Sequence, residues 1–158
     1  LLEQEVWPVY ETSLIAEADG IPLAIALKSI EQIAILDRED IRLKDKTFYG
    51  TFNKKQLPLI HFADFDQTTA SDRPVHRLSD TVPTVILRSP LGPIGLIVNK
   101  IEDQFEIVVR PFPETVTAQP CLRGTSVLSD DRIAFVLAEE KIQDLARIFW
   151  KKGGRHEL

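Results

Sequence analysis

The feature that most constrains the fold is a series of short apolar runs separated by turn signals. Directly after the Asp19–Gly20 pair, four apolar residues alternate with smaller ones: Ile21, Leu23, Ile25 and Leu27. A period of two places such a set on one face of a β-strand, and an Asp-Gly pair favours a tight hairpin turn. Comparable runs recur at residues 13–18, 47–52, 57–60, 84–88, 94–98, 105–109, 122–128 and 133–137. The pattern predicts a fold built mainly of β-strands.

Two segments depart from this pattern. Ser29 stands where it could cap a single helical turn that contains Ile30 and Ile33. Apolar residues at sustained helical spacing appear only near the C-terminus, from Ala138 to Phe149. We therefore expect one substantial helix, over about residues 138–152.

The chain divides into two β-rich halves. Between them lies an aperiodic stretch that is rich in Asp, Thr, Ser and Pro. We expect a single domain over residues 1–158, with subdomain one at about 13–65, a connection at about 66–83 and subdomain two at about 84–137. The predicted fold class is all-β, with two small β-barrels and a C-terminal α-helix.

Composition excludes several functions. The net charge of −5 argues against broad nucleic-acid binding, and no apolar run approaches the roughly 20 residues of a membrane span. No signal peptide is visible, and a single cysteine suits a reducing, cytoplasmic setting. The chain starts at Leu1 and contains no methionine, which favours a segment of a longer protein.

No catalytic or cofactor-binding pattern is present. The Gly92–Gly95 segment is too short for a phosphate-binding loop and contains a proline. His61, Asp64 and Asp66 match no metal-ligand spacing, and Cys121 lacks a nearby basic partner, so a buried, inert thiol is the favoured interpretation. We expect no catalytic residues, no metal and no cofactor, and a function that depends on surfaces.

Several motifs extend beyond a generic β-barrel. In the second half, residues 95–101 (GLIVNKI) lead into 104–111 (QFEIVVRP), and 122–128 (LRGTSVL) lead into 131–137 (DRIAFVL). In the first half, residues 19–25 (DGIPLAI) and 57–60 (LPLI) fit the same scheme. In this order and spacing the chain resembles CheW-like domains over about residues 13 to 150. It departs from them at Asn53–Lys54, where the family often has Arg-Gly, at residues 62–66, and in the connection.

The resemblance implies a pair of five-stranded, SH3-like barrels that share a hydrophobic seam. CheW-like domains occur as free adaptors and as the C-terminal regulatory domain of CheA-type histidine kinases, and they are not themselves catalytic. The implied partners are the cytoplasmic hairpin of a chemoreceptor and another CheW-like domain. The implied function is a scaffold that couples chemoreceptors to a histidine kinase, in the cytoplasm and recruited to membrane-associated receptor arrays.

Contact residues follow from the resemblance and from strand position. Ile33 and Ile35 lie where the family contacts its receptor, whereas Phe48 and Phe52 lie on strands that could present aromatic side chains to a partner barrel. Val98 and Val108 are further candidates. The alternative for all of them is burial in a core, the usual place of apolar strand residues. The alternative function is an unrelated tandem β-barrel that binds a small ligand or a peptide.

Overall fold

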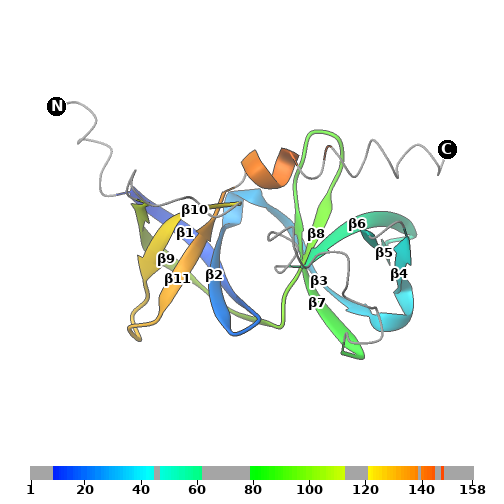
Figure 1. Cartoon of the computed structure of the whole chain (residues 1–158), viewed down its shortest axis with the longest axis horizontal. Helices are drawn as coiled ribbons and strands as arrows, with labels where there is room; N and C mark the ends of the chain where they lie inside the picture. Colours follow the sequence, from blue (N-terminus) through cyan, green and yellow to red (C-terminus); the bar gives the residue numbers. More distant parts are fainter. Residues whose placement is uncertain are drawn as a thin grey trace.

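The computed structural model describes residues 9–44, 47–61, 79–112, 121–138, 140–144 and 147. Within them, the strands form two sheets that lie side by side (Figure 1). One is a closed barrel with the strand order β1-β2-β11-β10-β9, and the other is a six-stranded sheet with the order β3-β7-β8-β6-β5-β4. The predicted all-β fold with two β-rich subdomains is confirmed.

The barrel draws its strands from both ends of the chain. It comprises β1 (Val9–Ala18), β2 (Ile21–Ala26), β9 (Lys100–Pro111), β10 (Leu122–Val127) and β11 (Ile133–Leu137). The first strand pairs antiparallel with both β2 and β9, and a short parallel pairing of β11 with β2 closes the ring. Its interior is filled by small and branched residues: Ile15, Ala24, Ile107, Val109, Leu128, Ala134 and Val136.

The second sheet is built from the middle of the chain. It comprises β3 (Ile30–Asp37), β4 (Ile41–Lys44), β5 (Thr47–Phe52), β6 (Lys55–His61), β7 (Thr81–Leu87) and β8 (Ile94–Ile97). Its two outermost strands, β3 and β4, are joined by only three residues, the 3-10 turn Arg38–Asp40. Because that short link holds both edges at one corner, the sheet must curl around its core. The turn at Arg38–Asp40 also divides residues 30–44 into two strands, β3 and β4. The sheet therefore has six strands, whereas the resemblance implied five.

The predicted division into residues 13–65 and 84–137 is wrong in its strand membership. The chain leaves the barrel after β2, builds the second sheet, and returns to the barrel at β9. Strand β7 also begins at Thr81, inside the expected connection of residues 66–83, of which 66–78 lie outside the described residues. Local periodicity shows that a strand exists but not which strand it pairs with, and this caused the error.

The predicted helical turn at Ser29 is also wrong. A 3-10 helix covers Leu27–Ser29, with no side-chain cap, and Ile30 already belongs to β3. The spacing of three between Ile30 and Ile33 comes from a β-bulge between Ile30 and Gln32. An extra residue in a bulge shifts the alternation by one, which imitates helical spacing in the sequence.

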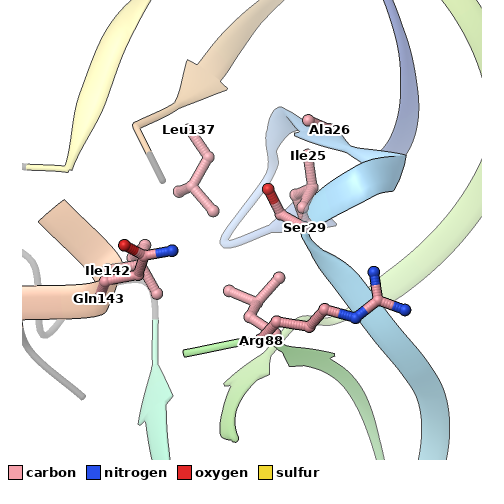
Figure 2. Close-up of a pocket in the computed structure, with 8 residues that line it drawn as sticks. Ile25, Ala26, Ser29, Arg88, Leu137, Ile142 and Gln143 are labelled. Carbon is pink, nitrogen blue, oxygen red and sulfur yellow. The ribbon is translucent and has the colours of Figure 1, made fainter. Parts of the chain in front are cut away.

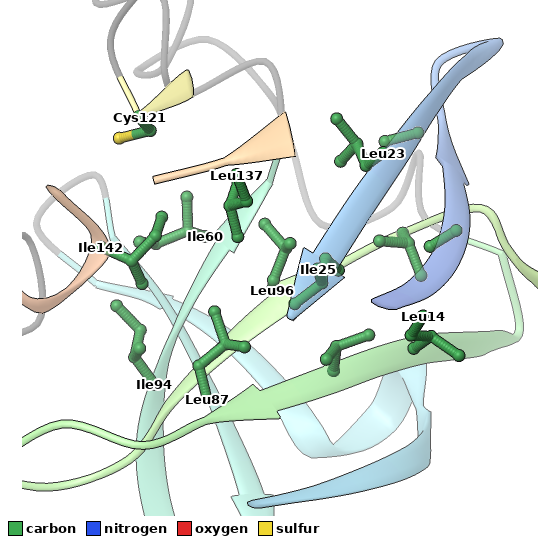
Figure 3. Packing of buried hydrophobic residues seen from close by; sticks show 14 of the residues in the cluster. Leu14, Leu23, Ile25, Ile60, Leu87, Ile94, Leu96, Cys121, Leu137 and Ile142 are labelled. Atoms are coloured by element: carbon green, nitrogen blue, oxygen red, sulfur yellow. The ribbon is translucent and has the colours of Figure 1, made fainter. Parts of the chain in front are cut away.

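A shared hydrophobic core joins the barrel to the second sheet (Figure 3). We call it the seam. Leu14, Leu23 and Ile25 reach it from the barrel, and Ile60, Leu87 and Leu96 reach it from the second sheet. The other buried members are Ala16, Ala18, Val85, Ile94, Val98, Cys121, Leu122, Leu137 and Ile142. Since both sheets contribute one face to the seam, separating them would expose apolar surface to water.

The helical segment caps this seam. Residues 140–144 and 147 are helical, and Ile142 is buried among the seam residues. The expected helix over 138–152 is thus found in part, and residues 148–152 lie outside the described part of the chain. No helix within the described residues is long and apolar enough to cross a membrane.

Asn99 ties the barrel to the second sheet at the end of the seam. Its side-chain oxygen accepts a hydrogen bond from the backbone N–H of Asp19 at 2.6 Å, and its own N–H donates to the carbonyl of Glu17 at 2.7 Å. Directly before it, the N–H of Val98 donates to the carbonyl of Pro83 at 3.1 Å. The β1–β2 turn is therefore fastened at the point where β8 passes into β9.

Gly124 sits where β9 and β10 approach most closely. A Cβ atom on this glycine would lie 2.4 Å from the backbone oxygen of Arg110. We expect Gly124→Ala to lower the free energy of unfolding by about 2–3 kcal/mol, because a backbone atom cannot swing aside as a side chain can. Urea unfolding followed by far-ultraviolet circular dichroism measures this. Thr125→Ala is the matched control, and an equal loss in both variants would contradict the steric explanation.

Lys54 occupies a backbone conformation that favours glycine. Asn53 and Lys54 form the two-residue turn between β5 and β6, with φ angles of 53° and 66°. We expect Lys54→Gly to raise the free energy of unfolding by about 0.5–1 kcal/mol, because the left-handed region is strained for a residue with a Cβ atom. Thermal unfolding checks the sign. Lys55→Gly, one residue later and within β6, should show no gain.

Candidate partner-binding surface

The exposed face of β3 presents two isoleucines beside the seam. Ile33 is 40% exposed and Ile35 is 61% exposed, high values for residues in the middle of a strand. In the ladder with β7, Ile33 lies opposite Val85 and Ile35 lies opposite Pro83. Val85 belongs to the seam, and directly opposed residues share a sheet face. Both isoleucines therefore extend the seam face of the second sheet outward into solvent.

The bulge in β3 makes this row continuous. Ile30, on the near side of the bulge, lies opposite the seam residue Leu87 and packs against the seam. With its extra residue, the bulge brings Ile30, Ile33 and Ile35 onto one face although their spacing is three and then two. Exposure rises along the row as it leaves the seam. We call these three residues and Pro83 the isoleucine shelf.

The shelf lies on an edge strand. In the sheet order β3 pairs only with β7, so its second edge has no strand partner among the described residues. Asp37 is exposed at the outer end of the row, and it is followed by Arg38, which forms an ion pair with Asp80 at 3.1 Å. An apolar face with charges at its end, on a strand that has one unpaired edge, is typical of a surface that another protein covers.

The other predicted contact residues do not gather on this shelf. Phe48 is 2% exposed, inside the core of the second sheet, and Val98 is 2% exposed, inside the seam. The core alternative is thus correct for these two, and neither offers a surface. Phe52 is half-buried against the second sheet's core, and Val108 is half-buried on the barrel.

Sequence reasoning missed the rest of the exposed apolar surface. The sequence places Pro83 in the expected connection, whereas the structure places it in β7, directly opposite Ile35. On the barrel, Tyr10, Val127 and Ile133 are exposed by 63%, 52% and 55%. The sequence contains one signal of this surface. Val108 stands between Glu106 and Arg110 at a spacing of two, on the face of β9 that alternation predicts to be polar.

His61 has a structural environment. Its side chain is buried at the end of β6, and its Nδ1 atom lies 3.8 Å from Oδ2 of Asp19 in the β1–β2 turn. Asp64 and Asp66 lie outside the described residues. Among the residues that are described, no three His, Cys, Asp or Glu side chains gather as metal ligands would.

A small pocket lies where the helical segment meets the seam (Figure 2). Ile142 and Gln143 face Leu137 and Ile25 across it, and Arg88 extends along one side. The Arg88 guanidinium donates from Nη1 to the carbonyl of Lys28 at 3.0 Å. With a volume of about 10 Å³ the pocket is the size of one water molecule, too small for an organic ligand.

The chain matches the family model described as CheW-like domain over residues 12–146. Among solved structures it is similar to the scaffolding protein TtCheW from Thermoanaerobacter tengcongensis, with a TM-score of 0.60 and 13% sequence identity. That match covers 83% of this chain and 89% of the other. No curated protein matches the sequence significantly.

The Cys121 thiol is expected to be unreactive in the folded protein. Burial raises the pKa of this thiol to about 11, so at pH 8 only about one molecule in a thousand carries the reactive thiolate. A disulfide reagent added at pH 8 should react slowly with the native protein and fast in denaturant. Equal rates in the two conditions would show that the side chain is accessible.

Proposed function

Because the chain belongs to the CheW-like domain family, we propose that it is a non-catalytic scaffold module that couples chemoreceptors to a histidine kinase. The single observation that carries the receptor part is the isoleucine shelf, which presents Ile33 and Ile35 to solvent at the rim of the seam. The proposed ligand of this shelf is one apolar face of the receptor's cytoplasmic helical hairpin.

The chemistry of the shelf supports a helical partner. A row of branched apolar side chains along one strand suits the i, i+3, i+4 face of an amphipathic helix. Burying an exposed isoleucine removes apolar area from water, which favours binding by about 1.5–3 kcal/mol for a full side chain. Such a contact depends little on salt, because ions screen charges and leave apolar burial largely intact.

Control of a kinase requires that the receptor states differ in their affinity for the module. A receptor whose signalling states bound the shelf equally would shift no equilibrium, however tight the complex. The shelf can discriminate, since a shift of the hairpin along the strand replaces apolar contacts with the charged outer end at Asp37 and Arg38. Phosphoryl transfer belongs to a separate kinase domain.

The second proposed partner is another CheW-like domain, of the adaptor type or from a CheA-type kinase. Whether this chain acts as a free adaptor or as the regulatory domain of a kinase, the proposed assembly is the same. We place it in the cytoplasm, recruited to membrane-associated receptor arrays through the hairpin.

Ile35→Asp tests the receptor contact. The carboxylate would lose water on binding without gaining a partner, so we expect the affinity for a soluble receptor hairpin to fall at least thirtyfold, or about 2 kcal/mol. Titration calorimetry at low and at high salt measures the affinity. Because Ile35 is 61% exposed, the variant should fold, which circular dichroism checks.

Leu91→Asp is the matched control, since Leu91 is 53% exposed, lies in the β7–β8 loop and is not one of the shelf residues. It should bind the hairpin as the parent does. Unchanged binding by folded Ile35→Asp would remove the shelf as the receptor site. Absence of binding by the parent chain itself would contradict the scaffold function.

A further inference from the structure

A row of apolar side chains crosses the outer face of the barrel, beyond the residues that pack into the seam. Tyr10 on β1 lies directly opposite Val108 on β9, and Val127 on β10 lies directly opposite Ile133 on β11. Val108 and Val127 line the same hollow between β9 and β10. Four adjacent strands thus each contribute one apolar residue to a continuous row. We call it the barrel row.

The barrel row lies outside the barrel interior and outside the seam. Along β9 the interior residues are Ile107 and Val109, so Val108 points outward, as do its strand neighbours Glu106 and Arg110. Tyr10, Val127 and Ile133 are each more than half exposed. A solvent-facing sheet surface is normally polar at such positions, and a row that is apolar on four strands marks a contact surface.

Opposite charges border the row on its two sides. Glu106 precedes Val108 by one outward position and Arg110 follows it by one, so a carboxylate stands on one side and a guanidinium on the other. Both side chains are exposed. Neither forms an ion pair with another of the described residues, so both charges are available to a partner.

The acidic side also contains the hollow. Its volume is about 290 Å³, and its polar lining comes from Glu106, Ser129, Asp130 and Arg132. The Arg132 guanidinium is already engaged, in two hydrogen bonds of 2.7 and 2.9 Å to Glu102 and one of 2.8 Å to Asp130. Glu106 is the carboxylate left to receive a cation. The hollow forms because the β9–β10 ladder runs only from Gly124 to Thr125, after which the strands separate.

We propose that the barrel row is a self-association surface on which a second copy of this chain docks about a two-fold axis parallel to the row. Rotation about that axis reverses the strand direction, so it sets the row of one copy against the row of the other. It also sets Arg110 of each copy against the hollow and Glu106 of its partner. The charge pattern thus complements itself, as an isologous contact requires.

A two-fold axis parallel to the strands would instead oppose Glu106 to Glu106 and Arg110 to Arg110. The charges therefore select one of the two symmetric arrangements. The inference deepens the proposed pairing with another CheW-like domain and rests on that part of the proposed function. It is separate from receptor binding, which is assigned to β3 in the second sheet.

The contact is expected to be weak. The barrel row with its two charge pairs is much smaller than the roughly 20–30 residues that each partner contributes to a stable interface. Such a surface associates measurably only at high protein concentration, or where many copies are held close together. The purified chain should be a monomer when dilute and should dimerise reversibly toward millimolar concentration.

Charge exchange provides the test, with sedimentation velocity over a range of concentrations at low salt as the measurement. Glu106→Arg and Arg110→Glu should each weaken self-association about tenfold, because both charge pairs become repulsive. An equimolar mixture of the two variants should associate at least as tightly as the parent, since every unlike pair is attractive again. The double variant Glu106→Arg/Arg110→Glu should also recover.

Apolar substitutions test the row itself. Ile133→Lys should weaken self-association, whereas Leu91→Lys, at nearly equal exposure, should not. A parent chain that stays monomeric at millimolar concentration would overturn the proposal, and so would a mixture no tighter than the single variants. Receptor-hairpin binding, measured on the same proteins, separates the two ideas. If the hairpin binds and the chain does not self-associate, only the barrel row is wrong, whereas hairpin binding lost in the parent refutes the receptor function.

Discussion

The packing of the two sheets against each other at the seam is the interaction on which the rest of the structure depends. Leu14 and Leu23 from the barrel meet Ile60 and Leu96 from the second sheet, so each sheet completes the core of the other. The helical segment adds Ile142 to the same core. Every surface feature described above takes its position from the seam. The isoleucine shelf is the part of the second sheet's seam face that the barrel does not cover. The barrel row is the part of the barrel's outer face that does not pack into the seam.

Much of the fold could be predicted because its signals are local. The Asp19–Gly20 hairpin is present, with both residues at positive φ as a two-residue turn requires. The strands around Leu23, Leu59 and Val136 follow from alternation or from apolar runs in the sequence. The pairing of strands could not be predicted this way, because residues as far apart as Val9 and Val109 become neighbours only through the path of the chain. The bulge beside Ile30 was invisible for a related reason, since one inserted residue gives a strand the spacing of a helix.

The candidate site was predictable only in part. Ile33 and Ile35 were placed by resemblance to a family, and the structure gives them the exposure that a contact needs. Phe48 and Val98 are also apolar residues in predicted strands, but both are buried in a core. Apolar identity alone cannot separate the two cases, because the face of a strand residue depends on register and a single bulge reverses it. The charges beside Val108 carried more information, since an apolar residue flanked by outward-facing Glu106 and Arg110 must itself point outward.

The interleaved course of the chain also sets an order of events during synthesis. As the polypeptide leaves the ribosome, residues 30–97 emerge with all six strands of their sheet, while β1 and β2 still lack β9, β10 and β11. Within this domain, the two strands at the N-terminal end are thus the ones that wait longest for their remaining partners. Until β9 arrives, the apolar face of β1 has only the second sheet to rest on, which makes the seam a holding surface for a nascent hairpin as well as the core of the finished protein.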